Sequence, residues 1–162
     1  MALLRVMVLS LAACGHAGAE PPVEQPVASG IAAPTGWEAL PDVAKAVAAA
    51  ARGPGVAVDG SEAWGERARG CYAMWLAMHG EGASATAILD GIAAEGITTR
   101  ELVTPQNSTE GVVSFAFDKG VYKGHLRARI AAGKITALAC FANDREPKAC
   151  EAPCTALLGG LP

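Results

Sequence analysis

The stretch VVSFAFDKGVYKGHLRARI, residues 112–130, contains the clearest structural pattern in the chain. Val113, Phe115 and Phe117 alternate with other residues, and a second alternation follows the turn signal Asp118-Lys119-Gly120. In that second run the apolar residues are Tyr122, Leu126, Ala128 and Ile130, and the basic residues between them are Lys123, His125, Arg127 and Arg129. Because successive side chains of a strand point to opposite faces, the pattern predicts a β-hairpin with one core face and one wet face.

The residues that follow extend this hairpin. A second turn at Ala131–Lys134 leads into a third predicted strand over residues 135–141. A short helix is expected from about Pro147 to Leu158. The carboxy-terminal part of the chain is therefore predicted to be a three-stranded β-meander that ends in a helix.

Two helices are predicted upstream of the meander. An alanine-rich segment from Pro41 to Arg52 begins with proline, which is favourable at the first position of a helix, and Gly53-Pro54 follows as a stop. A second helix is predicted over Ala85–Glu95, with Ser84 as its N-cap and Gly96 as its terminator. The inward face of this second helix would consist of Ile88, Leu89 and Ile92.

The remaining segments show weaker patterns. Apolar residues from Ala68 to Met78 fit either a helix face or strand alternation, and we favour a strand. Residues 56–58 and 97–103 are also predicted to be extended. Together these elements predict a single α+β domain over residues 36–162, in which an antiparallel β-meander sheet packs against helices in two layers and is stapled by disulfides. The order of elements resembles the PsbP/Mog1-type sandwich, but no specific motif supports that resemblance, and it implies no functional residues.

The amino-terminal residues resemble a bacterial export signal. Met1–Ala13 contains a single positive charge at Arg5 and then an apolar run. The run ends in Leu11-Ala12-Ala13-Cys14, which resembles the lipobox of bacterial lipoprotein precursors. The resemblance implies a signal peptide over residues 1–13, cleavage before Cys14, a diacylglycerol on the cysteine sulfur, and a further acyl chain such as palmitate on the new amino group.

A competing cleavage site would give a different product. Ala17-Gly18-Ala19 fits the A-x-A rule of ordinary secretion, and cleavage there would discard Cys14 and release a soluble protein. In the lipoprotein interpretation, residues 14–35 form a proline- and alanine-rich tether that separates the domain from the bilayer.

The cysteine count agrees with lipidation of Cys14. The chain has five cysteines, and the other four are Cys71, Cys140, Cys150 and Cys154. Four cysteines suit two disulfides in an oxidising compartment, with three possible connectivities. We favour Cys71 with Cys154 and Cys140 with Cys150.

Composition excludes some classes of function. The net charge is −3, with 13 basic and 16 acidic residues, so no overall positive field exists to attract nucleic acid. No uninterrupted apolar run of about 18 residues is present that would predict a transmembrane helix. We therefore expect a partner other than nucleic acid, and a membrane attachment through lipid.

No motif predicts a catalytic, cofactor or metal site. The spacing C-x9-C-x3-C lacks the paired C-x2-C hooks of zinc sites, and His16, His79 and His125 lack the spacing of a helical metal pair. Residues 80–85 match G-x-G-x-x-A, but a chain of this length with an antiparallel meander favours a plain turn capped by Ser84. No G-x-S-x-G or S-x-x-K motif is present.

Two groups of residues are candidates for binding. The basic stripe of Lys123, His125, Arg127 and Arg129 is either a solvated sheet face or a docking surface for an anionic polysaccharide or protein. The larger aromatic residues either line a ligand groove or form the core, and in a chain with only 5% aromatic residues the core is favoured; they are Trp37, Trp64, Trp75, Tyr72 and Tyr122.

These observations predict a lipid-anchored cell-envelope protein that acts as a non-enzymatic binding or accessory module. The first alternative is a small hydrolase whose site is assembled from distant residues. The second is a soluble secreted protein that binds a ligand. A pocket that joins His79 or His125 to a carboxylate and a hydroxyl would favour the hydrolase.

Overall fold

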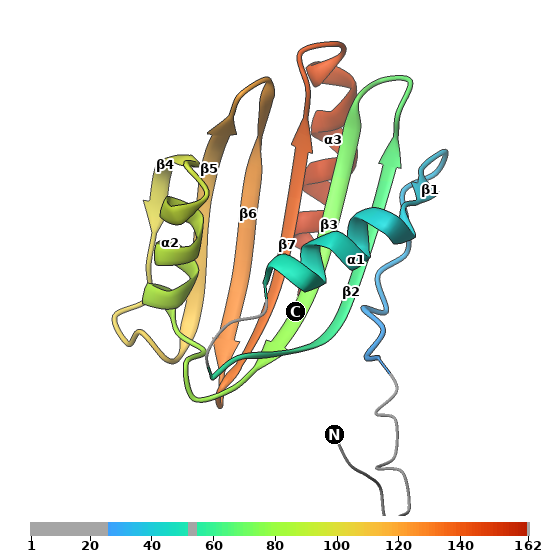
Figure 1. Cartoon of the computed structure of the whole chain (residues 1–162). Helices are drawn as coiled ribbons and strands as arrows, with labels where there is room; N and C mark the ends of the chain where they lie inside the picture. Colours follow the sequence, from blue (N-terminus) through green and yellow to red (C-terminus); the bar gives the residue numbers. More distant parts are fainter. Residues whose placement is uncertain (1–25, 52–54, 162) are drawn as a thin grey trace, which may run out of the picture.

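A seven-stranded antiparallel sheet forms the centre of the computed structural model, which describes residues 26–51 and 55–161 (Figure 1). Within these residues the strand order is β1-β2-β3-β7-β6-β5-β4, and three helices accompany the sheet. The strands are β1 (Glu38–Ala39), β2 (Ala57–Glu66), β3 (Cys71–His79), β4 (Thr98–Val103), β5 (Gly111–Lys119), β6 (Tyr122–Ala131) and β7 (Lys134–Ala142). The helices are α1 (Pro41–Ala50), α2 (Ala85–Ala94) and α3 (Pro147–Gly159). The α+β class and the antiparallel meander are confirmed.

The meander of β5, β6 and β7 follows the alternation of the sequence. Phe115 lies opposite Leu126, and Leu126 lies opposite Ala139, so one set of positions on all three strands faces the same side of the sheet. Ala132 and Gly133 connect β6 to β7, and both have positive φ, as a two-residue hairpin turn requires. The alternation within each strand therefore predicts which residues face each other, because each short turn fixes the register of the two strands that it connects.

The strand β3 joins the meander to the first half of the chain. It pairs with β7 on one side and with β2 on the other, which confirms the extended interpretation of the residues before Met78. Only residues 56–58 of the β2 region are predicted from the sequence, whereas β2 continues to Glu66. The Asp-Gly-Ser-Glu run of β2 has no apolar alternation, and a register shift between Val58 and Gly60 interrupts its pairing. The extended conformation of β2 therefore depends on pairing with β3 and is not predicted by the sequence of β2 itself.

The helices lie on both faces of the sheet, so the prediction of two layers is wrong and the structure has three. Figure 1 shows α1 and α2 in front of the sheet and α3 behind it. Residues Leu40 and Ala44 pack near Tyr72 and Met74 of β3. The disulfides of α3 reach alternate positions of β3 and β7, which face the opposite way. We call these two sides the α1/α2 face and the α3 face.

The aromatic residues divide between the two faces. All three tryptophans belong to the core under α3, together with Leu138, Leu157 and Leu161. The three phenylalanines and two tyrosines form a chain of ring contacts on the α1/α2 face. The expectation of a core role is therefore confirmed for the three tryptophans, but it is wrong for Tyr122, which is exposed at the tip of a hairpin.

Two disulfides staple the domain, but the favoured pairing is wrong. Cys71 is bonded to Cys150, and Cys140 is bonded to Cys154. The reason is the direction of α3, which returns antiparallel to β7 after residues 143–146. The earlier helix cysteine therefore lies over the end of β7, where Cys71 is located opposite Ala142, and the later one lies over Cys140.

Residues 26–35, which the sequence assigns to the tether, contact the domain. The Val27 amide donates to the Asp59 carbonyl, and the amide and hydroxyl of Ser29 donate to the Glu62 carboxylate at 2.8 and 2.6 Å. Ile31 packs against the core under α3. This stretch is therefore part of the packed structure. In the described part of the chain, no helix has both the length and the apolar character needed to cross a bilayer.

Candidate functional site

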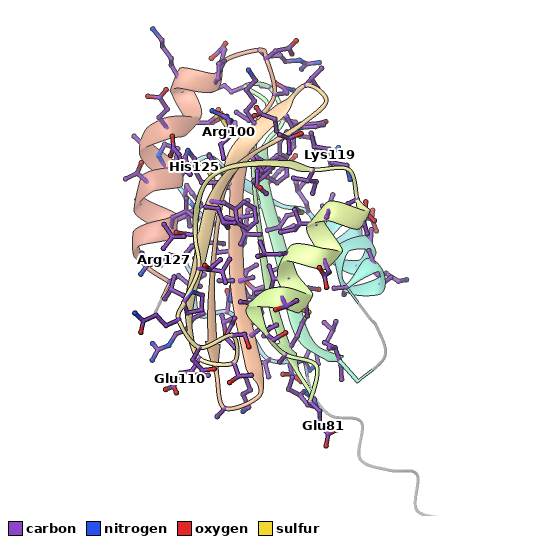
Figure 2. The ribbon with its side chains drawn as sticks, turned by 90° about the vertical axis from the view of Figure 1, so that its left-hand side faces the viewer. Glu81, Arg100, Glu110, Lys119, His125 and Arg127 are labelled. Carbon is purple, nitrogen blue, oxygen red and sulfur yellow. A yellow bond between two sulfur atoms is a disulfide. The ribbon has the colours of Figure 1, made fainter. Side chains whose placement is uncertain are left out.

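Half of the α3 face is left uncovered. The helix α3 contacts β7 and β3, and the strands β6, β5 and β4 extend beyond it. The basic stripe lies on this uncovered half, because His125 is the register partner of Cys140 and Arg127 is the partner of Leu138. All four residues of the stripe, Lys123, His125, Arg127 and Arg129, are exposed. Figure 2 shows His125 and Arg127 beside α3, with Arg100 near them.

A groove runs between α3 and the uncovered strands. It consists of a larger hollow of about 660 Å³ and a smaller one of about 180 Å³ toward Lys123. The two hollows share His125, Glu151 and Cys154 in their linings. We call this continuous depression the α3 groove, with β6 as its floor and α3 as one wall.

Small residues of β5 deepen the floor next to the stripe. Ser114 and Ala116 are the register partners of Arg127 and His125, and their short side chains leave space between β6 and the edge strand β4. On the opposite wall, Glu151, Cys154, Thr155 and Leu158 of α3 line the groove. Their spacing of three, four and seven residues places them on one helix face, and the bond from Cys154 to Cys140 holds that face toward the groove.

Both basic and acidic side chains line the groove. Arg100 of β4 contacts Asp118, with 2.8 Å between Nε and Oδ2. Among the residues that the structure describes, Lys123, Arg127 and Arg129 form no ion pair with a carboxylate. Two carboxylates, from Glu101 and Glu151, also line the larger hollow. The floor of the α3 groove is therefore basic, and its walls carry isolated acidic groups.

Asp118 lies next to the groove, as the register partner of Lys123. Its Oδ1 is buried and has no hydrogen-bond partner within the described part of the protein. Arg100 already occupies Oδ2, and Lys123 is the register partner of Asp118 on β6. A buried carboxylate oxygen without a partner is costly, and the two nearby cations reduce that cost.

The histidines do not form an acid–base set with a hydroxyl in the described residues. The ring of His79 pairs through Nδ1 with Asp59, at the far end of β3, but the nearby Ser61 hydroxyl donates to the Ala44 carbonyl on the α1/α2 face. His125 shares the α3 groove with Glu151 and Thr155, yet the Thr155 hydroxyl donates to the Glu151 carbonyl in its own helix. The larger hollow therefore joins His125 to Glu151 and to the hydroxyls of Ser114 and Thr155, but no hydrogen bond links a histidine ring to a hydroxyl in the described residues.

The remaining sequence candidates have structural roles. The four cysteines of the domain are all in disulfides, and no cluster of three metal-ligating side chains occurs in residues 26–51 and 55–161. The G-x-G-x-x-A segment connects the antiparallel strand β3 to α2, where the Ser84 hydroxyl caps the helix by accepting from the Ala87 amide at 3.1 Å. Cys14, His16 and the Ala17-Gly18-Ala19 site lie outside the described residues.

The sequence predicts the stripe but not the other residues that form the groove. Arg100 lies on an edge strand with an irregular register, and Glu151 lies on a separate helix, so only the fold brings them to β6. The available signal for Glu151 is helical spacing, because a residue three positions before Cys154 lies on the same side of the helix as that disulfide. The chain matches no protein-family model, no curated protein and no solved structure.

Proposed function

We propose that this protein is a lipid-anchored binding module of the bacterial cell envelope, and that its α3 groove binds a linear anionic polysaccharide. The observation that carries the proposal is the regular row of basic side chains on the open half of the α3 face. Lys123, His125, Arg127 and Arg129 occupy alternate positions of one strand, all exposed, beside a continuous groove.

The spacing of the row supports a repeating ligand. Alternate residues of a strand are about 6.8 Å apart, so the distance from Lys123 to Arg129 is about 20 Å. A linear polymer presents charges at regular intervals and can lie extended against the wall formed by α3. An acidic protein surface presents carboxylates at irregular positions, so the row favours the polymer.

The contrast between the groove and the whole chain also supports this function. The chain is acidic overall, with a net charge of −3, whereas the charged residues that line the two hollows are the cations Arg100, Lys123 and Arg127 and the carboxylates Glu101 and Glu151. This excess of positive charge in a depression raises the local concentration of anions. Polymer binding would therefore occur at this groove and not across the whole surface.

The expected location of the protein supports a binding partner in the cell envelope. The lipobox that ends at Cys14 implies attachment to a membrane, and two or more acyl chains are needed for stable anchoring. Two disulfides are typical of proteins in oxidising compartments outside the cytoplasm. A domain at this location is in direct contact with the anionic polymers of the envelope.

The test is a binding titration of the processed full chain with polygalacturonate, which carries one carboxylate per sugar, and with neutral dextran. We expect binding to polygalacturonate that weakens with added salt, and no binding to dextran. Arg127→Glu should weaken binding about five- to tenfold, because it replaces an exposed attraction with a repulsion. Glu151→Gln should strengthen binding, because it removes a carboxylate from the wall of the groove.

The matched control is Lys45→Glu, which makes the same charge change on α1, on the opposite face. Equal effects of Arg127→Glu and Lys45→Glu would show that only net charge matters and would contradict the groove assignment. Binding to poly-L-glutamate without binding to polygalacturonate would instead assign the groove to an acidic protein.

A further inference from the structure

A second pocket opens on the α1/α2 face, beside α2 and over the strands β5, β6 and β7. Its volume is about 300 Å³, and eight of the ten residues that line it are apolar. Figure 1 shows α1 in front of β2 and β3 and α2 in front of β4 and β5, with β6 between the two helices. Ala139, the one small residue among those that line the pocket, keeps its floor low.

The walls of this pocket are rigid aromatic rings. Phe141, which lines the pocket, is at the centre of the ring cluster, with ring centroids 5.5 Å from Tyr72, 5.7 Å from Tyr122 and 6.1 Å from Phe117. Ile92 of α2 and Ile97, which follows that helix, form the opposite side. Aromatic rings in mutual contact have few alternative positions, so the pocket is expected to exist before any ligand binds.

The polar groups of the pocket are gathered at one end. Lys119 and Tyr122 are register partners at the tip of the β5–β6 hairpin, and they are the two lining residues with polar ends. The Lys119 ammonium donates to the Glu95 carboxylate, with 2.9 Å between Nζ and Oε2, and both side chains are about half exposed or more. Figure 2 places Lys119 beside α2, on the side of the sheet away from His125 and Arg127.

We propose that this pocket binds a small amphipathic molecule with an apolar chain or ring system and an anionic end group. The apolar part would lie against Phe115, Phe117 and Phe141, and the anion would replace Glu95 as the partner of Lys119. A cavity of about 150 Å³ binds benzene, so a pocket of about 300 Å³ has room for roughly a dozen heavy atoms. This size is at the lower end of ligand pockets in proteins.

The proposal is independent of the groove. The two sites lie on opposite faces, and the ligand contacts named here involve none of the basic stripe. Loss of polymer binding would therefore leave this inference unaffected, and the reverse also holds.

The experiment is calorimetric titration of the processed full chain with decanoate, which has twelve heavy atoms, and with decanol, which lacks the charge. We expect saturable binding of decanoate, and weaker binding of decanol. Lys119→Gln should weaken decanoate binding about two- to fivefold and leave decanol binding unchanged. Glu95→Gln should strengthen decanoate binding, because it releases the lysine from its present partner.

Filling the pocket is the second arm. Ala139→Leu should weaken the binding of both ligands by about tenfold or more, because the added carbons occupy space that the ligand needs. The matched control is Ala94→Leu, at an exposed position near the end of α2. If thermal denaturation shows that Ala139→Leu does not fold, Ile97→Trp fills the pocket from its half-buried edge.

The proposal fails if decanoate gives no saturable binding, or if the folded pocket-filling variant binds as tightly as Ala94→Leu. It also fails if Lys119→Gln weakens decanol and decanoate equally, because the lysine would then act on packing and not on the anion.

Discussion

Cys150 of α3 is bonded to Cys71 of β3, a residue 79 positions earlier in the chain, and one helical turn later Cys154 is bonded to Cys140 of β7. The two bonds match in spacing. Four residues of a helix rise about 6 Å, and Cys71 and Cys140 are two register positions apart on adjacent strands, about 6.8 Å. The two disulfides therefore have a similar spacing on the helix and on the sheet. Together they prevent α3 from shifting along the sheet and over the groove.

The longer disulfide is predicted to stabilise the domain more than the shorter one. In the chain-entropy model, a loop of 79 residues is worth about 4.5 kcal/mol and a loop of 14 residues about 3 kcal/mol. Urea unfolding of the paired variants Cys71→Ala/Cys150→Ala and Cys140→Ala/Cys154→Ala measures both. A larger loss for the second pair would contradict this order, and peptide mapping without reduction would check the connectivity directly.

Substitution of Gly124 by alanine is predicted to destabilise the protein by about 1 to 3 kcal/mol, the range for overpacked sites. A Cβ at this position of β6 would collide with the Cys140 carbonyl and with Phe141 on β7. The same substitution at Gly91 of α2 has open space around it and should stabilise by about 0.5 to 1 kcal/mol, because alanine favours the helix. Thermal denaturation compares the two, and equal effects would exclude the close packing of β6 on Phe141.

Removal of the Ser84 hydroxyl is predicted to cost about 1 kcal/mol, the usual value of a helix N-cap. Ser84→Ala leaves the Ala87 amide without its acceptor, whereas Ser84→Asp retains an oxygen at the same place. The free energy of unfolding from urea titration is the measurement. If both variants lose equal stability, the cap is not the reason for the serine.

The resemblance of Leu11-Ala12-Ala13-Cys14 to a lipobox predicts a change of location when Cys14 is replaced. A Cys14→Ser precursor expressed in a bacterium should lose its lipid and move from the membrane pellet to the soluble fraction, whereas His16→Ala should remain with the membrane. Intact mass measures the modification of the wild-type chain. A wild-type amino terminus at Glu20 would instead support cleavage after Ala19 and a secreted soluble protein.

The sequence predicts those parts of the fold that depend on local pattern. The alternation from Val113 to Ile130 defines two strands and their inward faces, and Ser84 marks the start of α2. The helix predicted from Pro41 ends at Ala50 in the structure, and Arg52 lies outside the described residues. In each of these cases the signal lies within one turn or a few residues of the element it defines.

The parts that the sequence does not predict depend on direction in space. The strand β2 has a polar, glycine-containing run whose pairing is imposed by β3. The loop after β7 determines which face of the sheet α3 covers. The sequence does not show the direction of this loop, and for that reason both the number of layers and the disulfide pairing are predicted wrongly. The i, i+4 spacing of Cys150 and Cys154 does show that both lie on one side of a helix, and an antiparallel return of that helix leads to the observed pairing.

The candidate site also contains one part that the sequence predicts and another part that only the fold brings together. The basic stripe is visible in the alternation of β6, but Arg100 and Glu151 reach the groove only through tertiary packing. The apolar pocket beside α2 combines residues of β3, β5, β6, β7 and the α2 region, so no short pattern marks it. Residues that meet across several elements are determined by the fold and not by local sequence.

The separation of aromatic residues makes the two sides of the sheet optically distinct. Trp37, Trp64 and Trp75 lie under α3, and every tyrosine and phenylalanine lies on the other side. Intrinsic tryptophan emission therefore reports on events at the α3 side, while tyrosine and phenylalanine bands of near-ultraviolet circular dichroism include the opposite side. An unlabelled titration can thus indicate which side of the molecule a ligand has reached.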